Sequence, residues 1–82
     1  MKNKSKNVDI RYLPGDSVWI SGQDRICYID NVSIRKDDSG KFEVTYEWCN
    51  FDHGHDIIEV WDDGYFTNKD IGKIVFDHEI KL

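Results

Sequence analysis

One segment of this sequence gathers side chains that could bind a metal ion. Residues 49–56 read Cys-Asn-Phe-Asp-His-Gly-His-Asp. Cys49 precedes His53 by four residues and His53 precedes His55 by two, so a loop could bring one thiolate and two imidazoles to the same ion. A closed structural zinc site uses four nitrogen or sulfur ligands of this kind. These three residues are therefore the metal candidates of the chain.

The remaining ligands and the catalytic alternatives are weaker. Only Cys27 or His78 could complete the zinc set, and there is no Cys-x-x-Cys pair. A thiolate–imidazolium nucleophile would need a cysteine with a depressed pKa, whereas Cys27 stands among apolar residues, where burial makes a thiol inert. The adjacent carboxylates 37–38 and 62–63 stand on expected turns and point apart. We therefore expect no metal, no cofactor and no enzyme activity, with Cys49 a small buried hydrophobe.

A binding site is better supported by residues 61–66, Trp-Asp-Asp-Gly-Tyr-Phe, which put three aromatic rings around two acids. Such a patch suits a cationic ligand through cation–π contacts and charge pairing. In the alternative interpretation, Trp61 and Phe66 belong to the core and Tyr65 is half-buried. Glu43 and Glu47 lie on the polar face of the expected strand at residues 42–48. Trp19 stands between Val18 and Ile20, so on a strand its side chain would point to the opposite face from theirs. The expected partner-binding residues are Trp19, Glu43, Glu47, Glu59, Trp61, Asp62, Asp63 and Tyr65.

The charge is divided between a basic start and an acidic remainder. Residues 1–11 hold four Lys or Arg against one Asp, a balance of +3, and residues 12–82 hold seven against fifteen acids, a balance of −8. An acidic surface repels phosphate and so disfavours nucleic-acid binding by the folded part, while it suits a basic protein partner. The alternative is that the acids only keep a small domain soluble.

The alternation of apolar and polar residues predicts an all-β domain. Residues 42–48 (Phe-Glu-Val-Thr-Tyr-Glu-Trp) show it most clearly, and it breaks near Asp30 and Asn31, where we expect a bulge. The five strands are expected at 17–21, 25–35, 42–48, 57–61 and 73–77. Turns are expected at 13–16, 21–24, 36–41 and 62–64, a polar loop at 50–56, and one helical turn from Thr67 or Asn68 to Asp70. Residues 1–11 are expected to be a disordered basic arm and residues 12–82 the folded domain.

Two segments resemble known proteins. Gly15-Asp16-Ser17-Val18-Trp19 resembles the Gly-Asp-x-Val opening of SH3-like, Tudor-like and KOW-type barrels. Residues 71–76, Ile-Gly-Lys-Ile-Val-Phe, resemble the closing segment of small uncharacterised proteins of bacteriophages and prophages of Gram-positive bacteria. In that family a Leu-Thr-x-x-Glu-Ala helix usually follows, whereas Asp-His-Glu-Ile follows here. The resemblance implies a small five-stranded SH3-like barrel with a short helical turn before the last strand, and a mobile-element origin.

These observations combine into one expected function. We expect a non-catalytic phage or prophage protein that binds and inhibits a basic, nucleic-acid-handling host protein, such as a defence nuclease or a CRISPR effector. With two cysteines, no apolar stretch near the ~18 residues of a membrane span and no signal-peptide pattern, we expect it in the bacterial cytoplasm with reduced thiols. Two alternatives stay open. One is a nucleic-acid-binding barrel that uses Lys2, Lys4, Lys6 and Arg11, and the other is an adaptor that self-associates through an edge strand.

Overall fold

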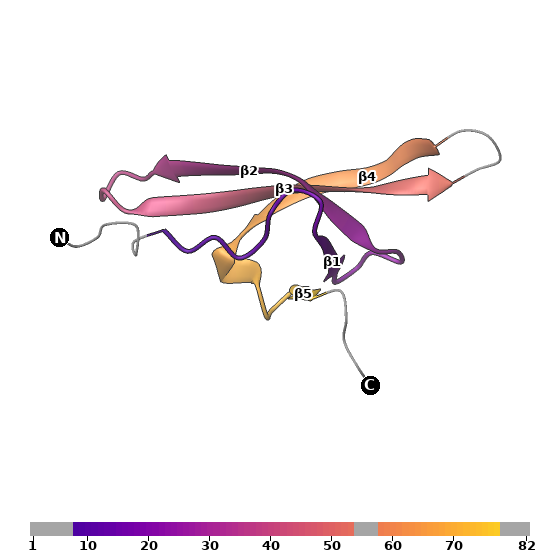
Figure 1. Ribbon diagram of the computed structural model, residues 1–82. Coiled ribbons are helices and arrows are strands. Elements are labelled where there is room, and N and C mark those ends of the chain that lie inside the picture. The colour runs from indigo at the N-terminus through magenta and orange to yellow at the C-terminus, as the bar shows by residue number, and fades with distance from the viewer. Residues whose placement is uncertain (1–7, 54–57, 78–82) are drawn as a thin grey trace.

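In the part of the chain that the structure describes, five antiparallel strands form one sheet with almost no helix (Figure 1). The computed structural model describes residues 8–53 and 58–77, with the backbone alone at residues 52 and 53. The elements are β1 (Ser17–Ile20), β2 (Cys27–Lys36), β3 (Phe42–His53), β4 (Ile58–Thr67), the 3-10 helix η2 (Asn68–Asp70) and β5 (Val75–Asp77). Their order in the sheet is β4-β3-β2-β1-β5. The predicted all-β class is confirmed, as are the number of strands and the short helical turn before the last of them.

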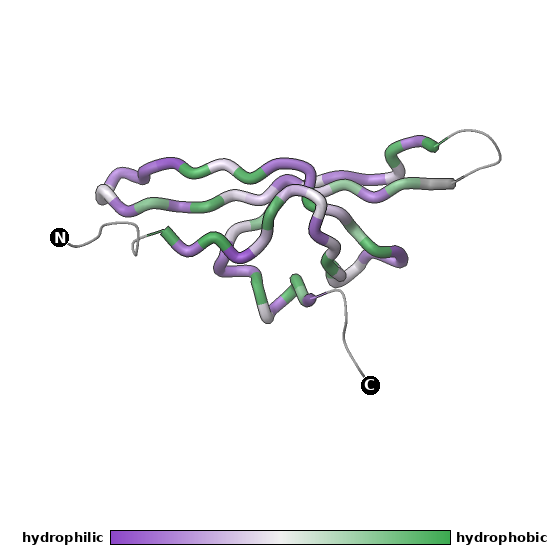
Figure 2. The backbone as a smooth tube through the Cα atoms, viewed as in Figure 1, coloured by the Kyte–Doolittle hydropathy of each residue, from purple (hydrophilic) through white to green (hydrophobic). Residues whose placement is uncertain are grey.

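The molecule is elongated because β2, β3 and β4 are long. Its principal extents are 54 × 30 × 22 Å. In Figure 1 the β2–β3 hairpin projects to one side, and β1 and β5 lie below the place where β2, β3 and β4 cross. Green and purple segments alternate along the β2–β3 hairpin in Figure 2, as expected for strands with one face toward a core.

Two bulges interrupt the ladders of the long strands. Ile29 pairs with Trp48 while Asn31 pairs with Glu47, so Asp30 is the extra residue of β2. The bulge predicted near Asp30 and Asn31 is confirmed. A second one lies in β4, where Trp61 has no partner on β3. A bulge places two consecutive side chains on the same side of the strand and bends it, and both bulges prove important for the site.

The predicted limits of the other strands differ from the structure by one or two residues, but two predictions were wrong by more. β3 was expected to end at Trp48, but it continues through His53, so most of the predicted polar loop is strand. A turn was expected at residues 62–64, but β4 runs without interruption through Asp62, Asp63 and Gly64. Gly64 does not turn the chain: it lies directly opposite Trp48, and an added Cβ would approach the indole ring to 2.8 Å. The glycine is needed for close packing of a tryptophan rather than for a turn.

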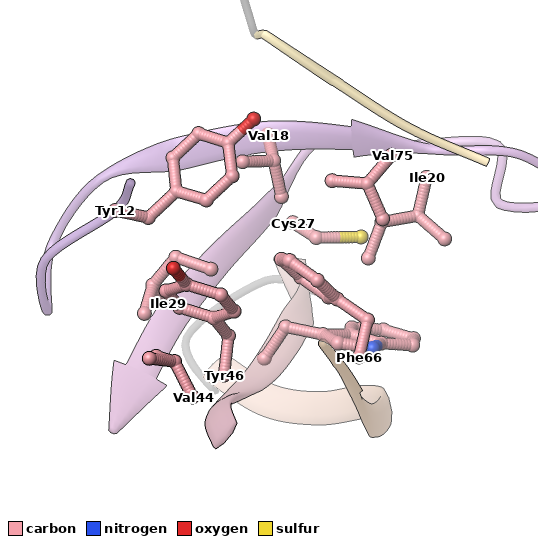
Figure 3. Packing of buried hydrophobic residues seen from close by; sticks show 10 residues of the cluster. Tyr12, Val18, Ile20, Cys27, Ile29, Val44, Tyr46, Phe66 and Val75 are labelled. Atoms are coloured by element: carbon pink, nitrogen blue, oxygen red, sulfur yellow. The ribbon is translucent and has the colours of Figure 1, made fainter. Parts of the chain in front are cut away.

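The core lies between the β1–β5 side of the sheet and β3–β4. Figure 3 shows Val18, Ile20 and Val75 on one side, facing Tyr46 and Phe66 on the other. The Tyr46 and Phe66 rings are stacked, with centroids 5.0 Å apart. The buried hydrophobic residues are Tyr12, Val18, Ile20, Cys27, Ile29, Val44, Tyr46, Trp48, Phe66 and Val75. These are the inward positions that strand alternation selects.

The segment before β1 covers part of this core. Val8 packs against the buried cluster, and Tyr12 lies within it. The backbone N–H of Arg11 donates to the Tyr46 hydroxyl at 2.9 Å, and the Asn68 amide donates to the carbonyl oxygen of Asp9 at 2.6 Å. Residues 8–11 of the expected arm are therefore bonded to β3 and η2. Residues 1–7 lie outside the described part of the chain.

The loop between β2 and β3 is organised by one carboxylate. Asp37 Oδ1 accepts hydrogen bonds from the Ser39 hydroxyl at 2.7 Å and from the backbone N–H groups of Ser39 and Lys41 at 2.9 and 3.0 Å. The hydrogen bond from the Ser39 hydroxyl, followed by that from the Lys41 backbone, holds the pKa of Asp37 below its ordinary value of 3.8. The ionised side chain thus fixes the hairpin turn.

In the Asp37→Asn variant, the fold is expected to lose less stability between neutral and acidic pH than it does in the unmodified chain. Because the pKa is lower in the folded than in the unfolded chain, the carboxylate stabilises the fold above the unfolded value, and this contribution is lost as the pH falls through the folded pKa. Urea unfolding at about pH 7 and about pH 2 should therefore show a smaller difference for Asp37→Asn than for the unmodified chain. Asp38→Asn, one residue away, is the control. Equal effects of the two substitutions would contradict the assignment.

Candidate acidic docking groove

The face of β3 and β4 opposite the core carries a groove. It has a volume of about 320 Å³. We call it the acidic groove, and its lining consists of Asp30, Glu47, Trp48, Cys49, Val60, Asp63, Gly64 and Tyr65. All three charged residues in this lining are acids. The apolar part includes Tyr65 and Val60, which expose 75% and 57% of their surface.

Strand register explains why these side chains meet. Val44, Tyr46 and Trp48 point into the core, so the residues between and after them point away from it. Glu47 lies opposite Tyr65, and Cys49 lies opposite Asp63. Residues directly opposite on an antiparallel pair have neighbouring side chains. The floor and two walls of the groove therefore follow from the pairing of β3 with β4.

The bulge in β2 supplies the third acid. Since Asp30 is the extra residue, its side chain lies on the same side as that of Asn31, which pairs with Glu47. The electrostatics agree with this placement: burial, followed by the charges of Asp30 and Asp63, raises the pKa of the Cys49 thiol. Cys49 thus lies close to both carboxylates, beneath the opening of the groove.

The three carboxylates of the groove lack cationic partners within the described chain. The ion pairs found there join Arg11 to Asp9 and Arg25 to Asp24. Neither pair includes a groove residue. Carboxylates that line one groove attract a cation to it. An arrangement of this kind is suited to a positively charged ligand.

No protein-family model, curated protein or solved structure matches this chain.

The β4 bulge directs two predicted site residues away from the groove. Trp61 lies under the Arg25 guanidinium, 4.5 Å from ring centroid to Cζ. Asp62 Oδ2 accepts a hydrogen bond from the Gln23 amide at 3.0 Å, and Gln23 Oε1 accepts one from the buried Asn50 at 2.9 Å. Trp61 and Asp62 therefore attach β4 to the turn between β1 and β2.

The other predicted site residues are more scattered. Trp19 is 38% exposed on β1 beside Phe76, away from the core as its parity predicts, but outside the groove lining. Glu43 lies opposite Arg35 in the β2–β3 hairpin. Glu59 is exposed on β4 but does not line the groove. Of the eight predicted residues, the structure brings together Glu47, Asp63 and Tyr65.

The structure describes the side chain of only one of the three metal candidates. Cys49 is partly buried in the groove floor, while His55 and the side chain of His53 lie outside the described part. Across the described side chains, no group of three or more His, Cys, Asp or Glu could hold a metal ion. Nor does any helix among residues 8–53 and 58–77 have the length and apolar character needed to cross a membrane.

The outer edge of β4 is partly occupied by carboxylates. The N–H of Asp63 donates to Asp62 Oδ1 at 2.9 Å, and the N–H of Thr67 donates to Asp70 Oδ2 at 3.0 Å. A strand that added to this edge would have to displace both side chains. Natural sheets use such devices to prevent edge-to-edge association, so this edge offers little support for the self-associating adaptor.

The two thiols are expected to react with iodoacetamide slowly and at different rates. Burial raises the pKa of Cys27, whose side chain is fully buried in the core. Burial and two acids raise the pKa of Cys49, but this side chain is only partly buried. Since the thiolate is the reactive form, both should react more slowly than a free thiol, and Cys49 before Cys27. Mass spectrometry of digested samples over time would measure both rates, and faster labelling of Cys27 would contradict the packing.

Proposed function

We propose that this chain is a small non-catalytic binding protein that attaches to a basic, nucleic-acid-handling protein and inhibits it. One observation carries the proposal: the acidic groove joins three acids, which have no cationic partner among the described residues, to exposed aromatic and apolar side chains. Charge and aromatic surface together suit a protein surface rich in Lys and Arg. A protein that handles nucleic acid has such a surface, where it binds the phosphate backbone. If this chain covers that surface, the nucleic acid can no longer bind there.

The origin and fold family belong to the same proposal. The five strands, their antiparallel order and the 3-10 turn before β5 support an SH3-like barrel. The closing segment, residues 71–76, supports a phage or prophage origin, in which a host defence protein is a natural target. The phage or prophage origin is supported by the resemblance alone, whereas the choice of a basic partner is supported by the groove.

Affinity capture from a bacterial lysate tests the proposal. The immobilised chain should retain a specific basic protein, and raising the salt from about 0.1 to about 0.5 M should release it. A double variant, Glu47→Gln with Asp63→Asn, should retain less than about a tenth as much, a difference of about 1.4 kcal/mol. The captured protein should then lose its activity on nucleic acid when the unmodified chain is added.

The matched control removes the same amount of charge elsewhere. Asp38 and Glu59 are both exposed and neither lines the groove, so Asp38→Asn with Glu59→Gln should retain the partner. If both double variants lost partner binding equally, the total charge of the chain and not the groove would explain binding, and the proposal would be overturned. Capture of no protein above the bead background would also overturn it. Tight binding of DNA or RNA in a gel shift would instead favour the nucleic-acid-binding alternative.

A further inference from the structure

The acidic groove has a specific shape as well as a charge. Its three carboxylates come from three neighbouring strands: Asp30 from β2, Glu47 from β3 and Asp63 from β4. Tyr65 stands beside Glu47 as its cross-strand partner and is 75% exposed. Cys49 lies at the floor, next to Asp30 and Asp63. A ligand in this groove meets acids on several sides and an aromatic ring at one wall.

Among the described residues, none supplies a cation to the groove. Arg25 is already engaged, with its guanidinium over Trp61 and Nη1 donating to the carbonyl oxygen of Phe51 at 3.0 Å. Arg35 lies opposite Glu43 on the β2–β3 hairpin. No Lys or Arg of the described residues lines the groove. Within the part of the chain that the structure describes, the groove is therefore open to a cation from another molecule.

We propose that the acidic groove binds the guanidinium of an arginine presented by the partner protein, in preference to lysine; this inference rests on the proposed function and deepens it. A guanidinium is planar and carries five N–H donors in a fixed fork, so it can bond to more than one carboxylate at once. Its flat face also stacks on an aromatic ring. An ammonium group is compact and strongly hydrated, and it cannot use carboxylates and ring together in this way.

Peptide titrations monitored by NMR test the inference on the full chain. Three blocked peptides of the same length in a Gly-Ser background would carry one arginine, one lysine or one citrulline, the last being a neutral isostere of arginine. The arginine peptide should shift the backbone amides of Glu47, Cys49, Asp63 and Tyr65 and bind at least about fivefold more tightly than the lysine peptide, and the citrulline peptide should not bind.

The position of Cys49 gives a second readout. A side chain seated in the groove covers this thiol, so the arginine peptide should slow its alkylation by iodoacetamide. The labelling rate of Cys27, which lies in the core, should not change. Tyr65→Ala should remove the preference for arginine over lysine, because the exposed ring is lost while the three carboxylates stay. Glu47→Gln with Asp63→Asn should abolish binding of both cationic peptides.

Several results would overturn the inference. They are equal affinity for the arginine and lysine peptides, amide shifts confined to residues outside the groove, and arginine binding that survives the double substitution. Failure here can be distinguished from failure of the proposed function. Groove-dependent capture of a partner with no arginine preference overturns this inference alone. Arginine binding in the groove without capture of a partner overturns the proposed function and leaves the arginine pocket standing.

Discussion

Replacing Gly64 with alanine is expected to destabilise the fold by about 1–3 kcal/mol, the range for overpacked cores. An added Cβ would stand 2.8 Å from Cζ2 of Trp48 and 3.0 Å from its Cε2 and Nε1 atoms. Real Cβ atoms do not approach carbon so closely, so the indole or β4 must move. The indole has little room because Trp48 is part of the buried cluster and only 8% exposed. Urea unfolding followed by tryptophan fluorescence would measure the change.

A double-mutant cycle identifies the cause. A phenyl ring lacks the part of the indole that meets Gly64, so Trp48→Phe should reduce the further cost of Gly64→Ala. Gly15→Ala is the matched control: Gly15 has φ of +97° and no atom within 4 Å of an added Cβ. Its cost comes from the backbone conformation and should be the same with Trp or Phe at position 48. A neutral Gly64→Ala, or a cost that Trp48→Phe leaves unchanged, would contradict the contact.

Strand alternation predicted the parts of the fold where one face is buried. Val18 and Ile20 point inward while Trp19 between them points out, as the period of two requires. The pattern of residues 42–48 is equally clear because Val44, Tyr46 and Trp48 all enter the core. In these strands the hydrophobic side chains alone determine both the element and its orientation.

The strand boundaries that were predicted wrongly are those where a polar residue or a glycine has a contact partner distant in the sequence. Asn50 is fully buried in β3, with its amide donating to Gln23 27 positions earlier. Nothing local distinguishes it from a loop asparagine. Gly64 likewise looks like a turn glycine until Trp48 is placed opposite it. Long-range contacts of this kind override local propensity, which is why the sequence alone favoured a loop and a turn.

The site, like the fold, was predictable from the sequence only in part. Glu47, Asp63 and Tyr65 were expected partner-binding residues, and the register of β3 and β4 joins them. Asp62 was grouped with Asp63 because the two are adjacent, but adjacent strand residues point to opposite faces. Asp30 was missed, although the broken alternation beside it was the available signal. A bulge adds a side chain to one face, and here it adds the third acid of the groove.

Replacing Tyr46 with phenylalanine is expected to cost about 1–3 kcal/mol, because two groups lose a buried partner. The hydroxyl accepts from the Arg11 backbone N–H at 2.9 Å and donates to Asn68 Oδ1 at 2.6 Å, and the Asn68 amide in turn holds the Asp9 carbonyl. One buried hydroxyl thus connects the segment before β1, β3 and η2. The ring keeps its packing against Phe66, so the loss is confined to these hydrogen bonds.

Two measurements separate this role from a general loss of packing. Urea unfolding gives the change in stability, and amide hydrogen exchange should show faster exchange at Arg11 in Tyr46→Phe. Tyr65→Phe is the matched control because it removes a hydroxyl from a side chain that is 75% exposed, and it should be neutral. If Tyr46→Phe and Tyr65→Phe unfolded alike and Arg11 exchanged at its original rate, the hydroxyl would not be the group that holds residues 8–11 on the sheet.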